Sequence, residues 1–193
     1  MAISDLRERR AAESRLVRES VRTFVMAAQA GDIKALSDIV CQFDLVFGLG
    51  PACLRAAARL PDVPWSTKKY FRELHYHDGD HLRQELGDRI LVDAYRVLLP
   101  SYRGPAVLLY RGEGADNRRR RCYGLSWSAN RSVAERFAEG TSRMYEDGSV
   151  LLETLAPPEA ILMKMPKRYG EDEYLVDRRS LRAVRVLQRS RRT

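Results

Sequence analysis

The sequence predicts an α+β protein in which a helical N-terminal lobe precedes a strand-rich core. Apolar residues recur at three- and four-residue spacing through the first half of the chain, and short β-branched and aromatic runs follow Pro100. Because helices and strands occupy separate halves instead of alternating, we expect a mixed, mostly antiparallel sheet. The predicted division is a helical lobe at 1–99 and a sheet core at 100–193, and 193 residues suit one compact domain overall.

The first predicted helices are delimited by capping and helix-breaking residues. The helix over 4–30 has Ser4 at its predicted start, and Gly31 is placed to end it. A second helix is predicted over 33–46. Pro51 is placed to open a third, short helix, because proline is tolerated in a first helical turn.

Two further helices complete the predicted lobe. Ser66 is a candidate cap for a helix over 67–74. A strongly periodic helix over 83–98 is expected to end just before Pro100. The polar residues 75–81 between these two helices are expected to form a loop.

The second half contains six predicted strands and one predicted helix. The helix spans 132–138, and the glycines at 112–114 predict a break after the first strand. The strands are predicted at 106–111, 123–128, 150–155, 160–163, 173–176 and 183–187.

The net charge of +8 is concentrated in two arginine-rich segments. One is Arg118–Arg121, and the other is the basic C-terminal tail from Arg178 onward, which contains no acidic residue. Such segments attract the phosphates of nucleic acid or an acidic partner, and a solvated surface is the alternative. The tail residues available for nucleic acid are Arg178, Arg179, Arg182, Arg185 and Arg189.

Composition and cysteine usage indicate a cytoplasmic protein with no membrane partner. No run approaches the roughly 18–20 apolar residues of a membrane helix, and residues 1–15 lack the apolar segment of a secretory signal. Cys41, Cys53 and Cys122 are too widely spaced for a disulfide scaffold or a thiolate zinc site. We therefore expect reduced cysteines in a bacterial or host-cell cytoplasm.

The first chemically informative segment is Leu109-Tyr-Arg-Gly112. An arginine at the end of a buried strand is costly unless an anion meets it, and a guanidinium pairs well with phosphate oxygens. Gly112 would let a ligand approach the backbone closely. The alternative is that Arg111 is exposed or paired within the protein.

The second segment is Gly124-Leu-Ser-Trp-Ser128, followed by the predicted helix. In a strand, Ser126 and Ser128 share one face while Trp127 takes the other. Two hydroxyls would thus line a cleft, with Phe137 of the following helix beside it. Paired serines on an ordinary edge strand are the alternative.

The third segment is Tyr169-Gly-Glu-Asp-Glu173, which leads directly into a buried strand. Glu171 and Glu173 are two residues apart, so we expect them to point the same way and Asp172 to point opposite. Two carboxylates this close suit the stabilisation of a cation or the removal of a proton. The alternative is an acidic turn before a strand.

In this order, the three segments resemble the Arg-Ser-Glu class of mono-ADP-ribosyltransferases, which includes bacterial toxins and phage enzymes. The resemblance spans roughly residues 100–187, and Trp127 stands where the toxins often have threonine. It implies a sheet core of ADP-ribosyltransferase type that binds NAD. The matched motifs are Tyr110-Arg111-Gly112, Leu125-Ser126-Trp127-Ser128 and Glu171-Asp172-Glu173.

The resemblance also implies how NAD would be held. Arg111 would neutralise a phosphate, and the backbone of Gly112 would bind the nicotinamide carboxamide. Ser126 would hold the nicotinamide ribose and orient the catalytic glutamate, supported by Ser128. Phe137 would stack on the nicotinamide ring.

The implied reaction transfers ADP-ribose from NAD to an arginine of a target protein and releases nicotinamide without a metal. Glu173 would bind the ribose 2′-hydroxyl and stabilise the oxocarbenium-like cation. Glu171 would position or deprotonate the incoming arginine, and Tyr169 would contact the target.

Several functional alternatives stay open at this stage. The acceptor could be nucleic acid, or water could serve and give an NAD glycohydrolase side activity. A non-catalytic module that binds NAD or nucleic acid is a third possibility. The chain would suit a phage modifier of host proteins, a delivered effector, or a toxin with an antitoxin partner.

Three other motifs were weighed against ordinary structural roles. His75, His77 and His81 could contribute to a metal site, but a polar loop explains them as well. Gly48-Leu-Gly50 lacks the third glycine of a dinucleotide-binding fingerprint. Cys122 lies beside an arginine, but no histidine base is placed to activate it.

Overall fold

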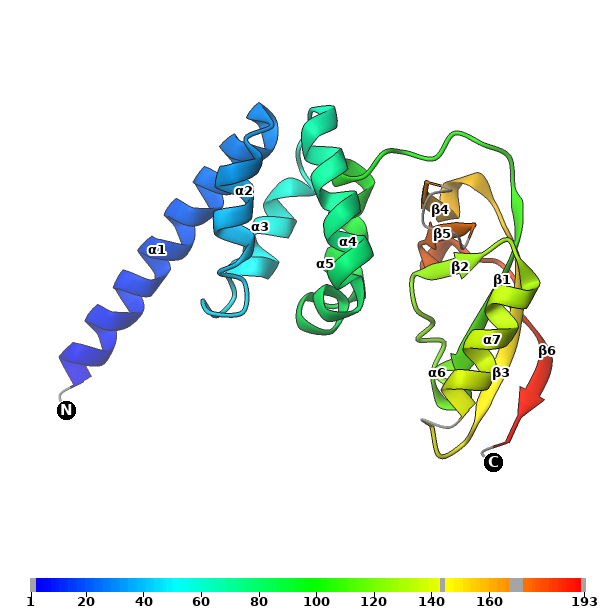
Figure 1. Ribbon diagram of the computed structural model, residues 1–193. Coiled ribbons are helices and arrows are strands. Elements are labelled where there is room, and N and C mark those ends of the chain that lie inside the picture. The colour runs from blue at the N-terminus through cyan, green and yellow to red at the C-terminus, as the bar shows by residue number, and fades with distance from the viewer. Residues whose placement is uncertain (1–2, 143–144, 167–171, 192–193) are drawn as a thin grey trace. The chain divides into compact units, whose positions relative to one another are not determined.

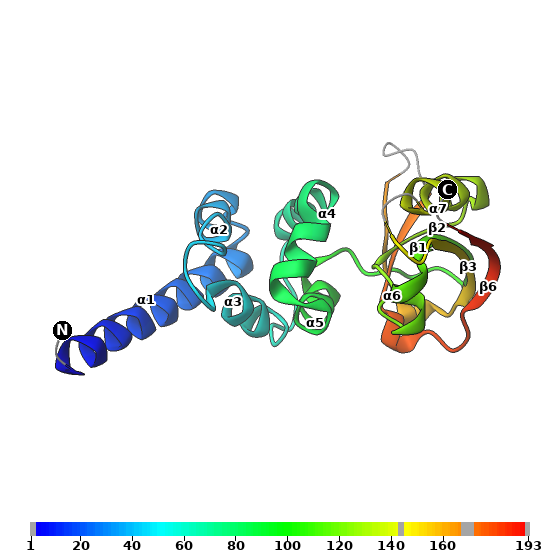
Figure 2. The ribbon, with the colours of Figure 1, turned by 90° about the horizontal axis from the view of Figure 1, so that it is seen from below.

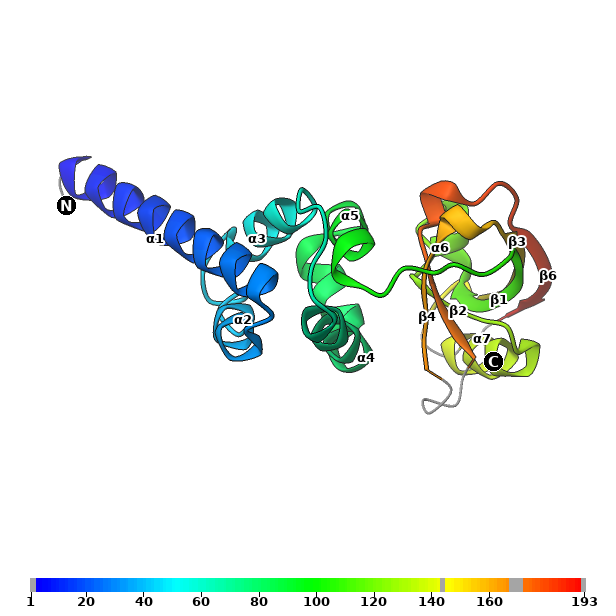
Figure 3. The ribbon, with the colours of Figure 1, turned by 90° about the horizontal axis from the view of Figure 1, so that it is seen from above.

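The chain divides into two compact units, Met1–Pro100 and Ser101–Thr193, in a computed structural model (Figure 1). The structure describes residues 3–142, 145–166 and 172–191, without the side chains of 3–6 and 141. The boundary between the units lies one residue after the one expected from the sequence. Figure 2 and Figure 3 show each unit from two further sides.

The first unit is built from five helices around an apolar core. Phe24, Phe71 and Tyr95 are buried in it, and the rings of Phe24 and Phe71 meet edge-on with centroids 6.2 Å apart. The helices are α1 (Ile3–Ala30), α2 (Ile33–Val40), α3 (Leu49–Ala57), α4 (Trp65–Leu86) and α5 (Asp88–Leu98).

The ends of α1 to α3 follow the capping residues only in part. Gly31 has a φ of +73° and ends α1 as predicted, but Ser4 lies inside that helix and does not cap it. Asp32 caps α2 instead, because its carboxylate accepts a hydrogen bond from Ala35 N at 3.0 Å. Pro51 falls in the first turn of α3 as expected.

The loop predicted over 75–81 is wrong, because α4 continues through it with a local kink at Asp78. Ser66 also lies within α4, which starts directly after Pro64. The single helix predicted over 83–98 is divided at Gly87, whose φ of +77° separates α4 from α5.

The second unit contains the predicted strands, arranged in one six-stranded sheet. The strand order is β4-β5-β2-β1-β3-β6, and every described pairing is antiparallel. The break predicted at 112–114 is wrong, because the first strand continues to Gly114. The strands are β1 (Val107–Gly114), β2 (Ser126–Ser128), β3 (Ser149–Ala156), β4 (Ile161–Lys164), β5 (Glu173–Val176) and β6 (Arg185–Ser190).

The two faces of the sheet have different coverings. On one face, Leu109 packs with Leu152, Trp127 and Tyr174 in the buried core of this unit. Helix α7 (Arg131–Ser142) lies on the other face against β1 and β3, whereas the short α6 (Ala115–Arg119) directly follows β1 (Figures 1 and 2).

None of the helices in the described part of the chain combines the length and the apolar character that crossing a membrane needs.

Candidate functional site

The three informative segments lie on neighbouring strands. Strand β2 is between β1 and β5 in the sheet, and one row runs across all three strands through Tyr110, Ser128 and Glu173. Residues directly opposite one another in an antiparallel pair have their side chains on the same face. Ser128 and Glu173 are therefore adjacent on one face, which Ser126 shares because it is two residues from Ser128.

The backbone at Glu173 is held on both sides. Glu173 is half-buried, opens β5 opposite Ser128, and accepts a hydrogen bond at its carbonyl oxygen from Met165 N at 2.8 Å. Ser128 is buried, and its hydroxyl oxygen accepts a hydrogen bond from Asn130 N at 3.0 Å. A carboxylate and two hydroxyls thus come from the paired strands β5 and β2.

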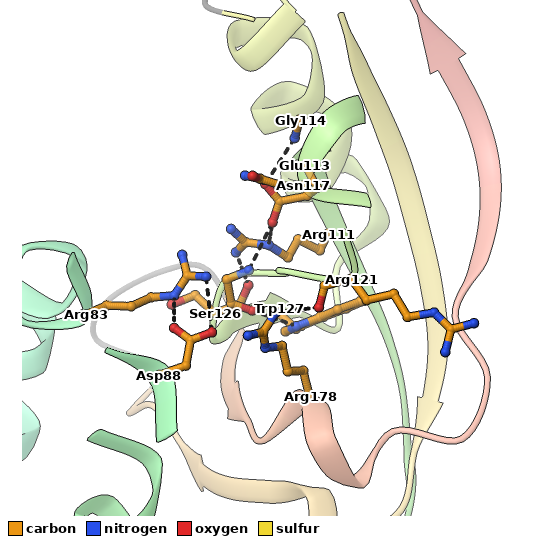
Figure 4. A network of polar contacts seen from close by, with 11 residues as sticks. Arg83, Asp88, Arg111, Glu113, Gly114, Asn117, Arg121, Ser126, Trp127 and Arg178 are labelled. Atoms are coloured by element: carbon orange, nitrogen blue, oxygen red, sulfur yellow. Dashed lines mark hydrogen bonds and ion pairs between the residues drawn. The ribbon is translucent and has the colours of Figure 1, made fainter. Parts of the chain in front are cut away.

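Arg111 belongs to the other face of the sheet. Alternation along β1 puts it on the side of Leu109 and Glu113, opposite to Tyr110. Its Nε donates to Glu113 Oε2 at 2.8 Å, and its Nη1 donates to the carbonyl oxygen of Ser126 at 2.5 Å (Figure 4). Arg111 is thus paired within the protein, which is the alternative that the sequence left open. The contact of Arg111 with a phosphate stays a prediction.

The carboxylate of Glu113 is the centre of a buried polar cluster. Besides Arg111, it accepts hydrogen bonds from Gly124 N at 2.9 Å, Gly114 N at 3.0 Å and Asn117 Nδ2 at 2.9 Å. Burial raises the pKa of this carboxyl, but the charge of Arg111 and these hydrogen bonds outweigh burial, so its pKa is lowered overall. Glu113 is therefore ionised at neutral pH although only 4% of the residue is exposed.

Gly112 is required by the approach of α7. A Cβ on Gly112 would lie 2.2 Å from Ala138 N and 2.6 Å from the carbonyl oxygen of Ala134, both backbone atoms of α7. The missing side chain therefore admits the helix. The predicted contact of the Gly112 backbone with nicotinamide is untested by this packing.

Phe137 is the aromatic residue of α7, and 53% of it is exposed. The helix is fixed beside it, because Ser149 Oγ donates to the carbonyl oxygen of Ala138 at 2.6 Å. An exposed ring on a fixed helix is available for stacking, and the nicotinamide contact stays a prediction.

Two of the predicted site residues, Tyr169 and Glu171, lie outside the described residues. Glu171 and Glu173 would share a face only with an extended chain between them. Asp172 has a φ of +43°, and β5 begins only at Glu173. The structure thus shows strand alternation only from Glu173 onward, and the role of Glu171 stays a prediction.

The two basic segments meet in the structure. Arg178 donates a hydrogen bond from Nη1 to the carbonyl oxygen of Arg121 (Figure 4). Part of the tail is already neutralised, because Arg179 is paired with Asp177 at 2.9 Å and Arg185 is paired with Glu153. Arg182 and Arg189 are exposed, the latter on the edge strand β6. Their contact with nucleic acid stays a prediction.

The histidines of α4 have separate partners. His75 Nδ1 lies 3.2 Å from the Tyr95 hydroxyl, and burial lowers the pKa of His75 to about 4. His81 Nε2 lies 3.0 Å from Asp44 Oδ2, which raises the pKa of His81. Within the described ranges, no three His, Cys, Asp or Glu side chains are grouped as metal ligands would be.

Comparison with protein-family models, with curated proteins and with solved structures finds no match to this chain. The motif resemblance and the geometry of the site are therefore the basis for a functional proposal.

Sequence reasoning overlooked Glu113 as the partner of Arg111, and Asn117 and Gly124 as donors to Glu113. One signal was present, because Glu113 is two residues after Arg111 in a strand and so shares its face. The hydrogen bond from Gly124 N to Glu113 had no such signal, because this bond depends on how the segment before β2 approaches β1.

Proposed function

We propose that this protein is an NAD-dependent mono-ADP-ribosyltransferase of the Arg-Ser-Glu class, with its six-stranded sheet as an NAD-binding core of that type. The observation that supports this most directly is the row in which Glu173 is opposite Ser128, with Ser126 on the same face. Glu173 is 45 positions from Ser128 in the sequence, and the three residues match in type the glutamate and serines that the resemblance implies.

The chemistry of this row suits cleavage of a glycosidic bond. In the proposed reaction, the bond between C1′ of the ribose and the nicotinamide nitrogen breaks, and nicotinamide leaves with the electron pair. Glu173 accepts a hydrogen bond from the ribose 2′-hydroxyl and stabilises the cation that develops at C1′. Ser126 holds the ribose, and Phe137 stacks on the leaving nicotinamide.

The acceptor in this proposal is the guanidinium of a target arginine. One of its nitrogens attacks C1′, and the proton that it loses goes to Glu171. A carboxylate is a suitable partner because it accepts two parallel hydrogen bonds from a guanidinium. Tyr169 contributes an aromatic contact to the target.

The proposal is tested by incubating the full chain with labelled NAD in cell lysate. We expect label on protein that hydroxylamine removes, and its loss in Glu173→Gln and Glu171→Gln. Glu159→Gln is the matched control, since Glu159 is near the opposite end of β5, where Asp177 N donates to the carbonyl oxygen of Ala160. Equal labelling by all four proteins would contradict the proposal.

Nucleic acid as the acceptor is the second candidate. It is supported by the hydrogen bond from Arg178 to Arg121, which joins the two arginine-rich segments. In the same labelling experiment, this candidate requires label that survives protease and is lost with nuclease. Release of nicotinamide without label would instead indicate a glycohydrolase.

A further inference from the structure

Strand β2 is joined to β1 by unusually little backbone pairing. Among the described residues, β1 and β2 are paired at one position, Tyr110 with Ser128, whereas β1 and β3 are paired at eight. The two serines of the proposed site therefore depend on something other than the β1–β2 ladder for their position relative to β1.

Side chains of β1 supply the missing connections. Arg111 donates to the carbonyl oxygen of Ser126 at 2.5 Å, and Glu113 accepts from the amide of Gly124 at 2.9 Å. These bonds hold the chain at Gly124 and at Ser126, where β2 begins. The two side chains are also bonded to each other at 2.8 Å, so the connection is a closed clamp between the strands (Figure 4).

The clamp is held in place at Glu113 on β1 and is closely packed against Gly124, just before β2. Gly114 N and Asn117 Nδ2 bind the second oxygen of Glu113 and fix the carboxylate in place. At the other end, a Cβ on Gly124 would lie 2.0 Å from Nη2 of Arg111 and 2.4 Å from Cζ. The guanidinium thus lies directly over the backbone of Gly124.

We propose that Glu113 is a positioning residue of the site: with Arg111, it sets where β2 presents Ser126 and Ser128 beside Glu173. The effect on NAD chemistry rests on the proposed function, but the effect on β2 does not. This pair suits the task because breaking it leaves the buried charge of Glu113 without compensation, so the two side chains stay together.

The chain offers a matched control for Glu113. Glu153 on β3 is also a buried carboxylate of this sheet paired with an arginine, Arg185. No described contact joins the Glu153 side chain to β2. Comparing Glu113→Gln with Glu153→Gln therefore separates an effect on β2 from a general loss of stability.

The first readout is amide hydrogen exchange of the full chain, which is independent of activity. In Glu113→Gln we expect exchange at residues 124–128 to become about tenfold faster or more, relative to exchange in β4, which contains neither substitution. Glu153→Gln is expected to leave that ratio within about twofold. Uniform acceleration across the sheet in Glu113→Gln, or none, would overturn the positioning role.

The second readout is the rate of nicotinamide release. A displacement of about 1 Å at a positioning group costs up to about 100-fold in rate, so we expect Glu113→Gln to lose about 10- to 100-fold in kcat. Glu113→Asp, which keeps the charge, is expected to recover part of this loss, and Glu153→Gln to retain the natural rate. If the natural chain releases no nicotinamide, the proposed function fails, and hydrogen exchange alone then decides the role of Glu113. Equal losses of kcat in Glu113→Gln and Glu153→Gln would overturn the positioning role of Glu113.

Discussion

Replacing Gly112 by alanine tests whether this glycine is there to admit α7. The new Cβ would lie 2.2 Å from Ala138 N and 2.6 Å from the carbonyl oxygen of Ala134. Because carbon contacts are comfortable only near about 3.5 Å, α7 would have to move by about 1 Å. Overpacking of this kind costs about 1–3 kcal/mol, which we expect as a loss in the free energy of unfolding.

The matched control is the same substitution at Gly140, on α7 itself, where a Cβ would meet nothing within 4 Å. Gly140→Ala should stabilise the protein by up to about 1 kcal/mol, because alanine favours the helix. Denaturant unfolding measures both variants. An unfolding midpoint for Gly112→Ala at or above that of the natural chain would refute the packing argument.

Three further perturbations test other parts of the structure. Since the pKa of buried His75 is lowered to about 4, the unfolded chain takes up a proton before the folded one does. Stability of the helical unit should therefore fall by about 3 kcal/mol between about pH 6.5 and pH 4. His75→Gln should remove this dependence in pH-resolved unfolding, whereas His77→Gln should keep it. Asp32→Ala should cost about 1 kcal/mol by removing the cap of α2, and an unchanged midpoint would contradict that capping role. Gly124→Ala should displace Arg111 and lower nicotinamide release about 10-fold or more, and full activity in this variant would count against the clamp.

Sequence patterns predicted the strands well because their signal is local. The run at 173–176 is apolar after its first residue and coincides with β5, and the run at 150–155 lies inside β3. The predicted helix boundaries are wrong where a polar segment contains a side chain that is buried in the core. The segment at 75–81 looks like a loop, yet a helix forms there because His75 is buried against Tyr95. Gly79 gives the His75 ring its space, since a Cβ there would lie 2.6 Å from that ring.

The sequence names the residues of the candidate site but does not predict how they are arranged. Ser126 and Ser128 share a face because of strand alternation alone. That β2 lies between β1 and β5 depends on pairing between segments distant in sequence, which no local pattern encodes. For the same reason the sequence left open whether an external anion or a group of the protein meets Arg111, and folding provides Glu113.

The most direct test of the central claim is nicotinamide release from NAD by the purified full chain, compared with Glu173→Gln and Glu159→Gln. We expect release by the natural chain and by Glu159→Gln. In Glu173→Gln, loss of electrostatic stabilisation at the transition state should lower the rate by about 100-fold or more. A folded natural chain that neither releases nicotinamide nor binds NAD in calorimetry would contradict the assignment, as would full activity in Glu173→Gln.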